Sequence, residues 1–277
     1  MSKTEVTILG CGSSLGVPRI DGYWGKANKK NPKNYRTRCS IFVKYKNINV
    51  IVDTSPDIKN QLLKNSIKRI DAVIYTHEHA DQTSGIFEMR PFFWKNKKKI
   101  PVYGSPRTIS ELKEKYTFCF SQRHGYKPIM KAYTIKNKFI IKKSNTNINF
   151  DSFDVTHGMI KATGYVFDKI AYISDCNKIS NKALKKLKNF IEKEIGDLTI
   201  DKITFLIVFI GEGVTHNKSN DLVNLLIELG SNIDNIRILH STKEEFPEQP
   251  KTVSFWEFFI KTPVYEINKN ETPLNRI

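Results

Sequence analysis

The segment Thr76–Gln82, with the sequence THEHADQ, constrains this chain more than any other. It places two imidazoles and a carboxylate at alternate positions, His77, His79 and Asp81, directly after the apolar run Asp71–Tyr75. The length and β-branched content of that run predict a buried strand. Imidazole and carboxylate are the ligands that zinc and similar transition metals take in open catalytic sites. We therefore predict a metal site at the end of this strand.

Three further strand-like runs lead into side chains of the same kinds. They are Asn149–Thr156 before His157, Ile170–Ser174 before Asp175 and Ile236–Leu239 before His240. Ligands at the ends of several strands can converge at one edge of a sheet, where the pockets of α/β proteins tend to lie. Any one of these histidines, taken alone, is better read as an ordinary core or surface residue. The set together favours a metal site.

The order of these residues resembles the signature of the metallo-β-lactamase superfamily, which is His-x-His-x-Asp-His, then a distant His, a bridging Asp and a last His. The opening Thr7–Pro18 and the segment Arg36–Ser40 are similar to one branch, the cyclic phosphate phosphodiesterases of phosphonate metabolism, which is related to the tRNA 3′-processing endonucleases. The resemblance runs from about Lys3 to about Pro247. It implies an α/β fold, a four-layer αββα sandwich, and we expect a single domain over residues 1–277.

The resemblance also implies two sets of metal ligands. The first metal would be held by His77, His79 and His157, and the second by Asp81, Asp175 and His240, with Asp175 bridging the two. The chain departs from the family at Gln82, where a histidine ligand is usual. A neutral amide oxygen is a much weaker zinc ligand than imidazole, so Gln82 is at best a weak ligand and we expect a weakened second site. Zinc is the expected metal, with manganese as the alternative.

Four residues are candidates for contact with a substrate. His216 precedes a predicted helix, and the resemblance implies that it contacts substrate or protonates the leaving oxygen, although a solvent-facing helix entry is its simpler reading. Asp81 would also orient the nucleophile. The glycine-rich loop around Ser13 exposes backbone N–H groups that can hold a phosphate oxygen. Arg38 is a candidate phosphate contact, with a structural salt bridge as an equally good alternative.

These residues predict an enzyme, a metal-dependent hydrolase. The favoured function is a phosphodiesterase that acts on a cyclic phosphate or nucleotide-like substrate with a metal-bound hydroxide as nucleophile. Two alternatives stay open. One is a tRNA 3′-processing-type endoribonuclease, although no long basic Gly/Pro-rich insertion is present to clamp RNA. The other is a degenerate metal-binding protein with weak or no hydrolase activity, because of Gln82.

The formal net charge of +17 raises the question of nucleic-acid binding. Lysine far outnumbers arginine, and Lys, Asn and Ile make up about a third of the chain, as an AT-rich genome would impose. Nucleic acid is therefore a partner that we do not favour over a small phosphodiester substrate. The chain has no apolar run of membrane-spanning length and no signal-peptide pattern, so we expect a cytoplasmic protein without a membrane partner. A homodimer stays open.

Apolar alternation and turn residues give the expected elements. The predicted strands are Glu5–Leu9, Ser40–Tyr45, Asn49–Val52, Ala72–Tyr75, Ile100–Tyr103, Phe139–Lys142, Asn149–Thr156, Gly164–Phe167, Ile170–Ser174, Thr204–Phe209 and Arg237–Leu239. The predicted helices are Pro56–Asn65, Ser105–Tyr116, Asn181–Glu194, Asn217–Leu229 and about Thr252–Ile260. Hairpin turns are expected at Lys46-Asn47 and Asp168-Lys169.

Overall fold

The computed structural model describes residues 4–25, 27–168, 170–176, 179–195, 205–209 and 236–239. Its strands are β1 (Glu5–Gly10), β2 (Ser40–Tyr45), β3 (Ile48–Val52), β4 (Ala72–Ile74), β5 (Ile100–Gly104), β6 (Met130–Thr134), β7 (Lys138–Lys143), β8 (Thr146–His157), β9 (Ile160–Phe167), β10 (Ile170–Ile173), β11 (Phe205–Phe209) and β12 (Ile236–Leu239). Its helices are η1 (Pro32–Asn34), α1 (Ile58–Lys64), α2 (Ala80–Thr83), η2 (Ile86–Met89), α3 (Arg90–Asn96), α4 (Pro106–Lys115), α5 (Thr117–Phe120) and α6 (Asn181–Ile195).

The strands form two six-stranded sheets, ordered β1-β2-β3-β4-β5-β6 and β12-β11-β10-β9-β8-β7. In the first sheet β1, β2 and β3 are antiparallel neighbours, and β3 to β6 run parallel. In the second sheet β7 to β10 are antiparallel, and β10 to β12 run parallel. Both sheets thus pass from an antiparallel part to a parallel part, which fits a fold made of two related halves.

Period-two alternation in the first sheet fills two separate cores. Val50 and Val52 of β3 point into a core shared with the second sheet, whereas Ile51 points to the opposite face. In β4, Ile74 belongs to the inter-sheet core and Val73 to the other. Because both of their faces are buried, β3 and β4 read as continuous apolar runs rather than as alternating ones.

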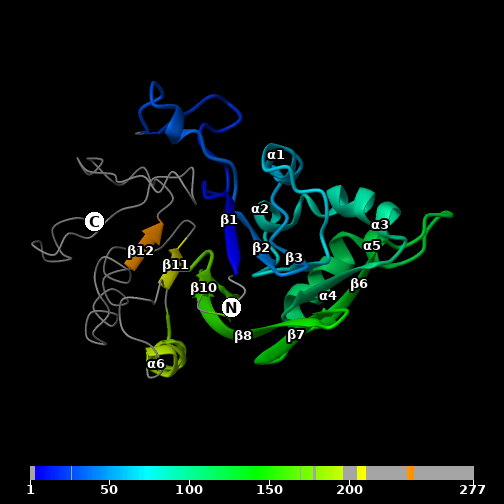
Figure 1. Cartoon of the computed structure of the whole chain (residues 1–277). Coiled ribbons are helices and arrows are strands. Elements are labelled where there is room, and N and C mark those ends of the chain that lie inside the picture. Colours follow the sequence, from blue (N-terminus) through cyan, green and yellow to red (C-terminus); the bar gives the residue numbers. More distant parts are fainter. Residues whose placement is uncertain are drawn as a thin grey trace, which may run out of the picture.

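Helices cover the outer face of each sheet. Side chains of α1, α4 and α5 join the outer core of the first sheet, and these helices lie together with α3 on that side (Figure 1). Helix α6 lies apart from them beside the second sheet, where Ala183 and Leu187 are buried (Figure 1). The expected four-layer αββα sandwich is therefore confirmed. None of the helices in the described ranges is long and apolar enough to span a bilayer.

Most predicted elements agree with the structure to within a few residues. The β2–β3 hairpin turns at Lys46 with a positive φ, and β9 pairs antiparallel with β10 across the turn at Asp168. The Ser180 hydroxyl accepts the backbone N–H of Ala183, as expected for a helix N-cap. The predicted helices Asn217–Leu229 and Thr252–Ile260 lie outside the described residues, and no observation tests whether residues 1–277 form one domain.

Strand β6 and the short helices η1, α2, η2, α3 and α5 were not expected from the sequence. Strand β6 lies at the edge of the first sheet, and Met130 is its only fully buried side chain, so its apolar alternation is weak. Helix α3 is seven residues long and carries Pro91 in its first turn, which is tolerated there because the first helical N–H groups have no intrahelical partner.

Candidate metal centre

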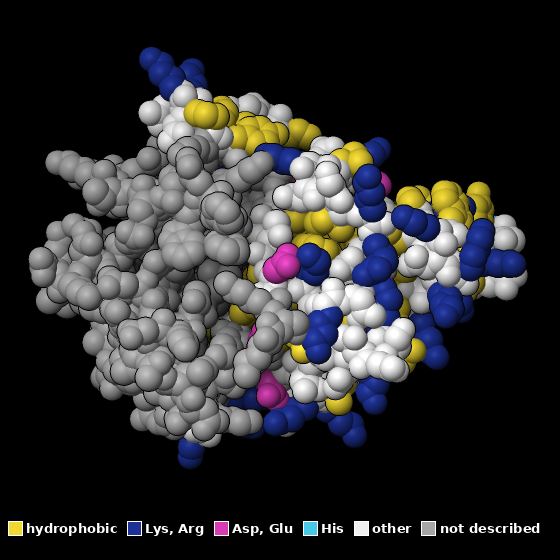
Figure 2. Space-filling model, viewed as in Figure 1, with side chains coloured by type: hydrophobic (Ala, Val, Ile, Leu, Met, Phe, Trp, Pro, Cys, Tyr) yellow, Lys and Arg dark blue, Asp and Glu magenta, His cyan; other side chains and the backbone are white. Residues whose placement is uncertain are grey.

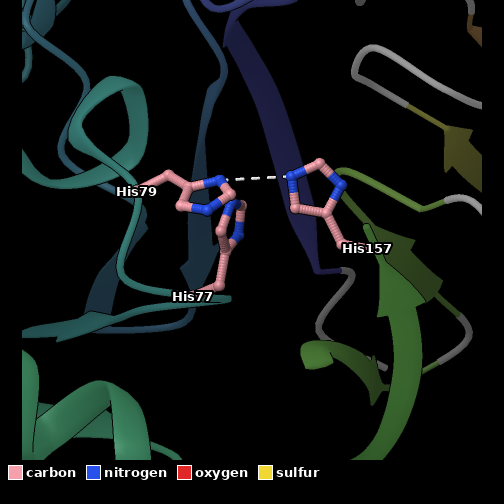
Figure 3. Close-up of side chains that lie close together, drawn as sticks. All are labelled: His77, His79 and His157. Atoms are coloured by element: carbon pink, nitrogen blue, oxygen red, sulfur yellow. Dashed lines mark hydrogen bonds between the residues drawn. The ribbon is translucent and has the colours of Figure 1, made fainter. Parts of the chain in front are cut away.

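Three imidazoles converge at one edge of the sandwich. The ligand nitrogens of His77, His79 and His157 all lie within 4.8 Å of one another, and their ring centroids are 4.7–5.0 Å apart. His157 Nε2 is 3.2 Å from His79 Nδ1. The three rings point toward a common point from two elements, the segment after β4 and the end of β8 (Figure 3). The expectation that these histidines meet is thus met by the structure.

Backbone hydrogen bonds hold the two segments that carry the histidines in place relative to each other. Just after β4, the Tyr75 N–H donates to the Tyr103 carbonyl of β5 at 2.8 Å. The Thr76 carbonyl accepts the N–H of Thr163 from β9 in the opposite sheet at 2.8 Å. His157 is the last residue of β8 and pairs with Ile160 of β9. Backbone hydrogen bonds therefore fix the distance between the two sides of the site.

A buried polar network lies beneath His77. The Asp53 carboxyl accepts the backbone N–H of Thr76 at Oδ1 and the Thr76 hydroxyl at Oδ2, both at 2.8 Å. Thr76 Oγ1 also lies 3.0 Å from His77 Nδ1 and 2.9 Å from the Ser174 hydroxyl that donates to it. When the Thr76 hydroxyl donates to Asp53, its remaining lone pair accepts an N–H from His77 Nδ1. This tautomer leaves the lone pair of His77 Nε2 directed toward the site.

Burial shifts the pKa of two of these groups. Burial, together with the smaller effect of the neighbouring His79 and His157, lowers the pKa of His77 to about 2, so this imidazole is neutral at physiological pH. A neutral imidazole is the form that binds a metal. Burial also raises the pKa of the Asp53 carboxyl from 3.8 to about 8, against the effect of the two hydrogen bonds from Thr76. If Asp53 is protonated at Oδ2, its hydroxyl donates to Thr76 Oγ1 and the Thr76 hydroxyl can donate to His77 Nδ1, so the ligand tautomer of His77 requires the Asp53 carboxylate.

Two carboxylates and an amide adjoin the histidines. Asp81 lies in the first turn of α2, which begins after His79, and Asp175 follows β10. Asp175 Oδ2 is 3.5 Å from His77 Nε2. The side-chain nitrogen of Gln82 donates to Asp81 Oδ2 at 2.9 Å and to Asp175 Oδ2 at 3.2 Å. Asp81 is therefore placed by a helix start rather than by strand alternation.

The residues present fit a first metal of the zinc type. Three imidazole nitrogens within 4.8 Å of one another need only small rotations to reach a common ion, given Zn–N bonds of about 2.0–2.1 Å. His77 is fully buried, whereas His79 is exposed, so the centre opens to solvent on one side. Three protein ligands with an open side are the arrangement of catalytic rather than structural zinc sites.

The other predicted site residues have different outcomes. His216 and His240 lie outside the described residues. Arg38 Nε forms a 2.9 Å ion pair with Asp57, and its side chain lies against Gly16, in the loop that holds Ser13. No observation tests substrate contact by Ser13 or Arg38, which stays a prediction.

Glu78 faces away from the metal centre, as its position between the two histidines suggests. Its carboxylate is buried and forms a 2.7 Å ion pair with Arg107 of α4, and the Thr108 hydroxyl donates to it at 3.3 Å. Glu78 therefore anchors the ligand segment to α4.

Sequence reasoning missed the residues that support the ligands. Asp53, Thr76 and Ser174 each stand at or just after a strand end, but they match no ligand spacing. The one available signal was a run of small polar residues, Asp53–Ser55, directly after the apolar strand β3. Asp53 has a positive φ of 63°, which aspartate tolerates better than most residues.

Comparison with known proteins places the chain in a family. The model of the β-lactamase superfamily domain matches residues 48–201, more than half of the chain. An octanoyltransferase from Porphyromonas gingivalis is 24% identical over 184 residues, which are 66% of this chain and 37% of that protein. The chain thus spans little more than a third of the length of this curated relative.

Solved structures share the fold at low sequence identity. A diphosphatase from the PhnP family superposes with a TM-score of 0.67 at 22% identity, covering 94% of this chain and 93% of that one. Zn²⁺-bound PqqB from Methylobacterium extorquens gives a TM-score of 0.54 at 15% identity, over 87% and 99% of the two chains. Unliganded yeast PDE1 gives 0.53 at 13% identity, over 87% and 88%. The chain belongs to the β-lactamase superfamily, and its fold is the metallo-β-lactamase fold.

Proposed function

We propose that this protein is a metal-dependent hydrolase that cleaves a phosphodiester, with a cyclic phosphate or nucleotide-like compound as substrate. The observation that carries the proposal is the convergence of His77, His79 and His157 beside the carboxylates of Asp81 and Asp175, at a site open to solvent. A partly buried cluster of this composition has no use in packing, because burying ionisable groups costs free energy.

Each residue has a definite task in this proposal. A divalent metal bound by the three imidazoles would act as a Lewis acid and lower the pKa of water to near 7. His77 is held in its ligand tautomer by Thr76 and Asp53. Asp175 lies next to His77, and its carboxylate would accept a proton from the attacking water or orient that water. Asp81 would also orient the attacking water. From the resemblance, His216 would give a proton to the leaving oxygen.

One of the similar structures supports a phosphorus-centred substrate, and another supports zinc as the metal. The first is described as a diphosphatase of the PhnP family, and it matches nearly the whole length of this chain. Zn²⁺ is bound in the PqqB structure, which supports zinc as the metal here. At these identities the likeness shows the fold, so substrate and metal are our proposals.

RNA processing is the second candidate, and the described part of the face seen in Figure 2 does not favour it. Lysine and arginine side chains are scattered over the described part of one face instead of gathering in a single stripe (Figure 2). A protein that tracks an RNA backbone is expected to present a continuous basic groove. We therefore favour a small substrate.

The test is turnover by the metal-reconstituted protein. Bis(p-nitrophenyl) phosphate and a panel of cyclic phosphodiesters are offered to protein loaded with Zn²⁺ or Mn²⁺. We expect metal-dependent hydrolysis that falls to background in His157→Asn. The matched control is His124→Asn, because His124 is exposed and adopts a positive φ that asparagine tolerates. Metal-loaded wild type that hydrolyses none of these compounds would leave the degenerate metal-binding protein as the better reading.

A further inference from the structure

Within the described residues, the place that the resemblance assigns to a second metal is bounded by two carboxylates and one amide. The Gln82 side-chain nitrogen lies 2.9 Å from Asp81 Oδ2 and 3.2 Å from Asp175 Oδ2. A primary amide has two N–H groups, so it can donate one to each carboxylate. The amide thus links the two side chains that the resemblance assigns to the second metal.

We propose that the Gln82 amide takes the place of the second metal ion, so that the centre is built for one ion. This inference rests on the metal site of the proposed function but not on its substrate. Two carboxylates that share a site repel each other unless a positive partner lies between them. In two-metal relatives that partner would be the ion, and here it is the partially positive NH₂ group of Gln82.

The surroundings hold the amide in this place. The Gln82 side chain is fully buried, and its backbone carbonyl accepts the Thr54 N–H at 2.8 Å. The Gln82 N–H donates to the His79 carbonyl at 3.1 Å, which ties the residue to the first ligand set. With both ends of the backbone fixed, the side chain has little freedom to leave the space between the two carboxylates.

The position of the Gln82 amide oxygen distinguishes the proposed role of Gln82 from that of a weak metal ligand. Gln82 Oε1 is buried and has no hydrogen-bond donor within the described part of the chain. Turning the amide to offer this oxygen to an ion would break both hydrogen bonds and point Oε1 at Asp81 and Asp175. In the observed orientation the NH₂ group of Gln82, and not its oxygen, faces the two carboxylates.

The two readings of Gln82 predict opposite results for its removal. If Gln82 is a weak ligand, Gln82→Ala removes a ligand and second-ion affinity falls. If the amide stands in for the ion, Gln82→Ala removes the group that lies between the two facing carboxylates. The metal-free variant then loses thermal stability, and its affinity for a second Zn²⁺ or Mn²⁺ rises.

Metal titration with chelator competition tests the inference. We expect wild type to bind one ion per chain, with any second ion at least on the order of 100-fold weaker. Gln82→Ala and the isosteric Gln82→Glu should tighten second-ion binding on the order of 10–100-fold, the size of effects from groups around a metal site. Gln122→Ala, the same change at an exposed glutamine, should leave the stoichiometry at one.

The outcomes separate this inference from the proposed function. Two ions of similar affinity in wild type, or unchanged or weaker second-ion binding in Gln82→Ala whatever Gln82→Glu does, would overturn the stand-in role and leave the hydrolase proposal intact. Wild type that binds no ion would refute the metal site itself. Because the readout is ion affinity, the test holds even when a variant has no turnover.

Discussion

The carboxyl group of Asp53 accepts both polar hydrogens of Thr76, the residue that immediately precedes the first histidine of the metal centre. Asp53 is fully buried at the end of β3, and Thr76 follows β4, so the pair joins two neighbouring parallel strands at the edge that bears the site. Through Thr76 Oγ1 the contact reaches His77 Nδ1. Asp53 is therefore a positioning residue for the first metal ligand.

Replacing Asp53 should weaken metal binding without touching a ligand. We expect Asp53→Asn to lower metal affinity about 10–100-fold and to lower the free energy of unfolding by about 1–3 kcal/mol at about pH 6. The measurements are metal titration and denaturant unfolding. Asp154→Asn, at an exposed carboxylate on β8, is the control and should change neither. Unaltered metal affinity in Asp53→Asn would show that His77 needs no support from this network.

The raised pKa of Asp53 predicts a pH dependence of stability in the metal-free protein. The folded pKa of about 8 exceeds the unfolded value of 3.8, so the folded state retains a proton that the unfolded state releases between them. The stabilisation is fully present below about pH 3.8 and is lost as the pH rises through about 8. The stability advantage of wild type over Asp53→Asn should therefore shrink across this window. A constant difference from pH 4 to 8 would contradict the raised pKa.

The sequence indicated the candidate ligands but not the residues that support them. His77, His79 and His157 followed from spacing and strand ends, because metal ligands must be imidazole or carboxylate. Asp53 and Thr76 act through hydrogen bonds to the ligands, and a hydrogen-bond partner can be any of several polar residues at no fixed spacing. Their roles therefore depend on three-dimensional contact between β3 and β4.

The same limit applies to the fold and to Gln82. Buried strands such as β3 and β4 are apolar on both faces and easy to find, whereas β6 is half exposed at an edge and shows little pattern. The departure at Gln82 was visible in the sequence, and the expected consequence was a weak ligand. Only the positions of the two carboxylates reveal which end of the amide faces them.

Close packing behind α2 should make Gly85 intolerant of any side chain. A Cβ at this position would lie 2.1 Å from the Ser55 carbonyl oxygen and 2.5 Å from Ile58, and the Gly85 N–H donates to the Thr54 carbonyl. We expect Gly85→Ala to cost about 1–3 kcal/mol of stability and to reduce metal affinity, because His79 is the N-cap residue of α2. Thermal unfolding checks this, with the exposed neighbour Ser84→Ala as control. If Gly85→Ala is as stable as wild type, residues 54–58 can move to make room for the added methyl group.

His216 should matter only for poor leaving groups. If it protonates the departing oxygen, His216→Ala should lower the rate on the order of 10²–10⁴-fold for an alkoxide leaving group. The loss should be much smaller for p-nitrophenolate, which departs without a proton, and metal content should stay the same. Equal losses on both substrates would restrict His216 to substrate binding, and loss of metal would make it a ligand.

The most direct test of the metal centre is X-ray absorption spectroscopy of the zinc-loaded protein. We predict three imidazole ligands with Zn–N distances of about 2.0–2.1 Å, and a decrease to two imidazoles or loss of zinc in His157→Asn. The chain also holds four buried cysteines, Cys11, Cys39, Cys119 and Cys176, which offer a different ligand type. A Zn–S shell at about 2.3 Å, or an imidazole count unchanged by His157→Asn, would contradict a site built from His77, His79 and His157.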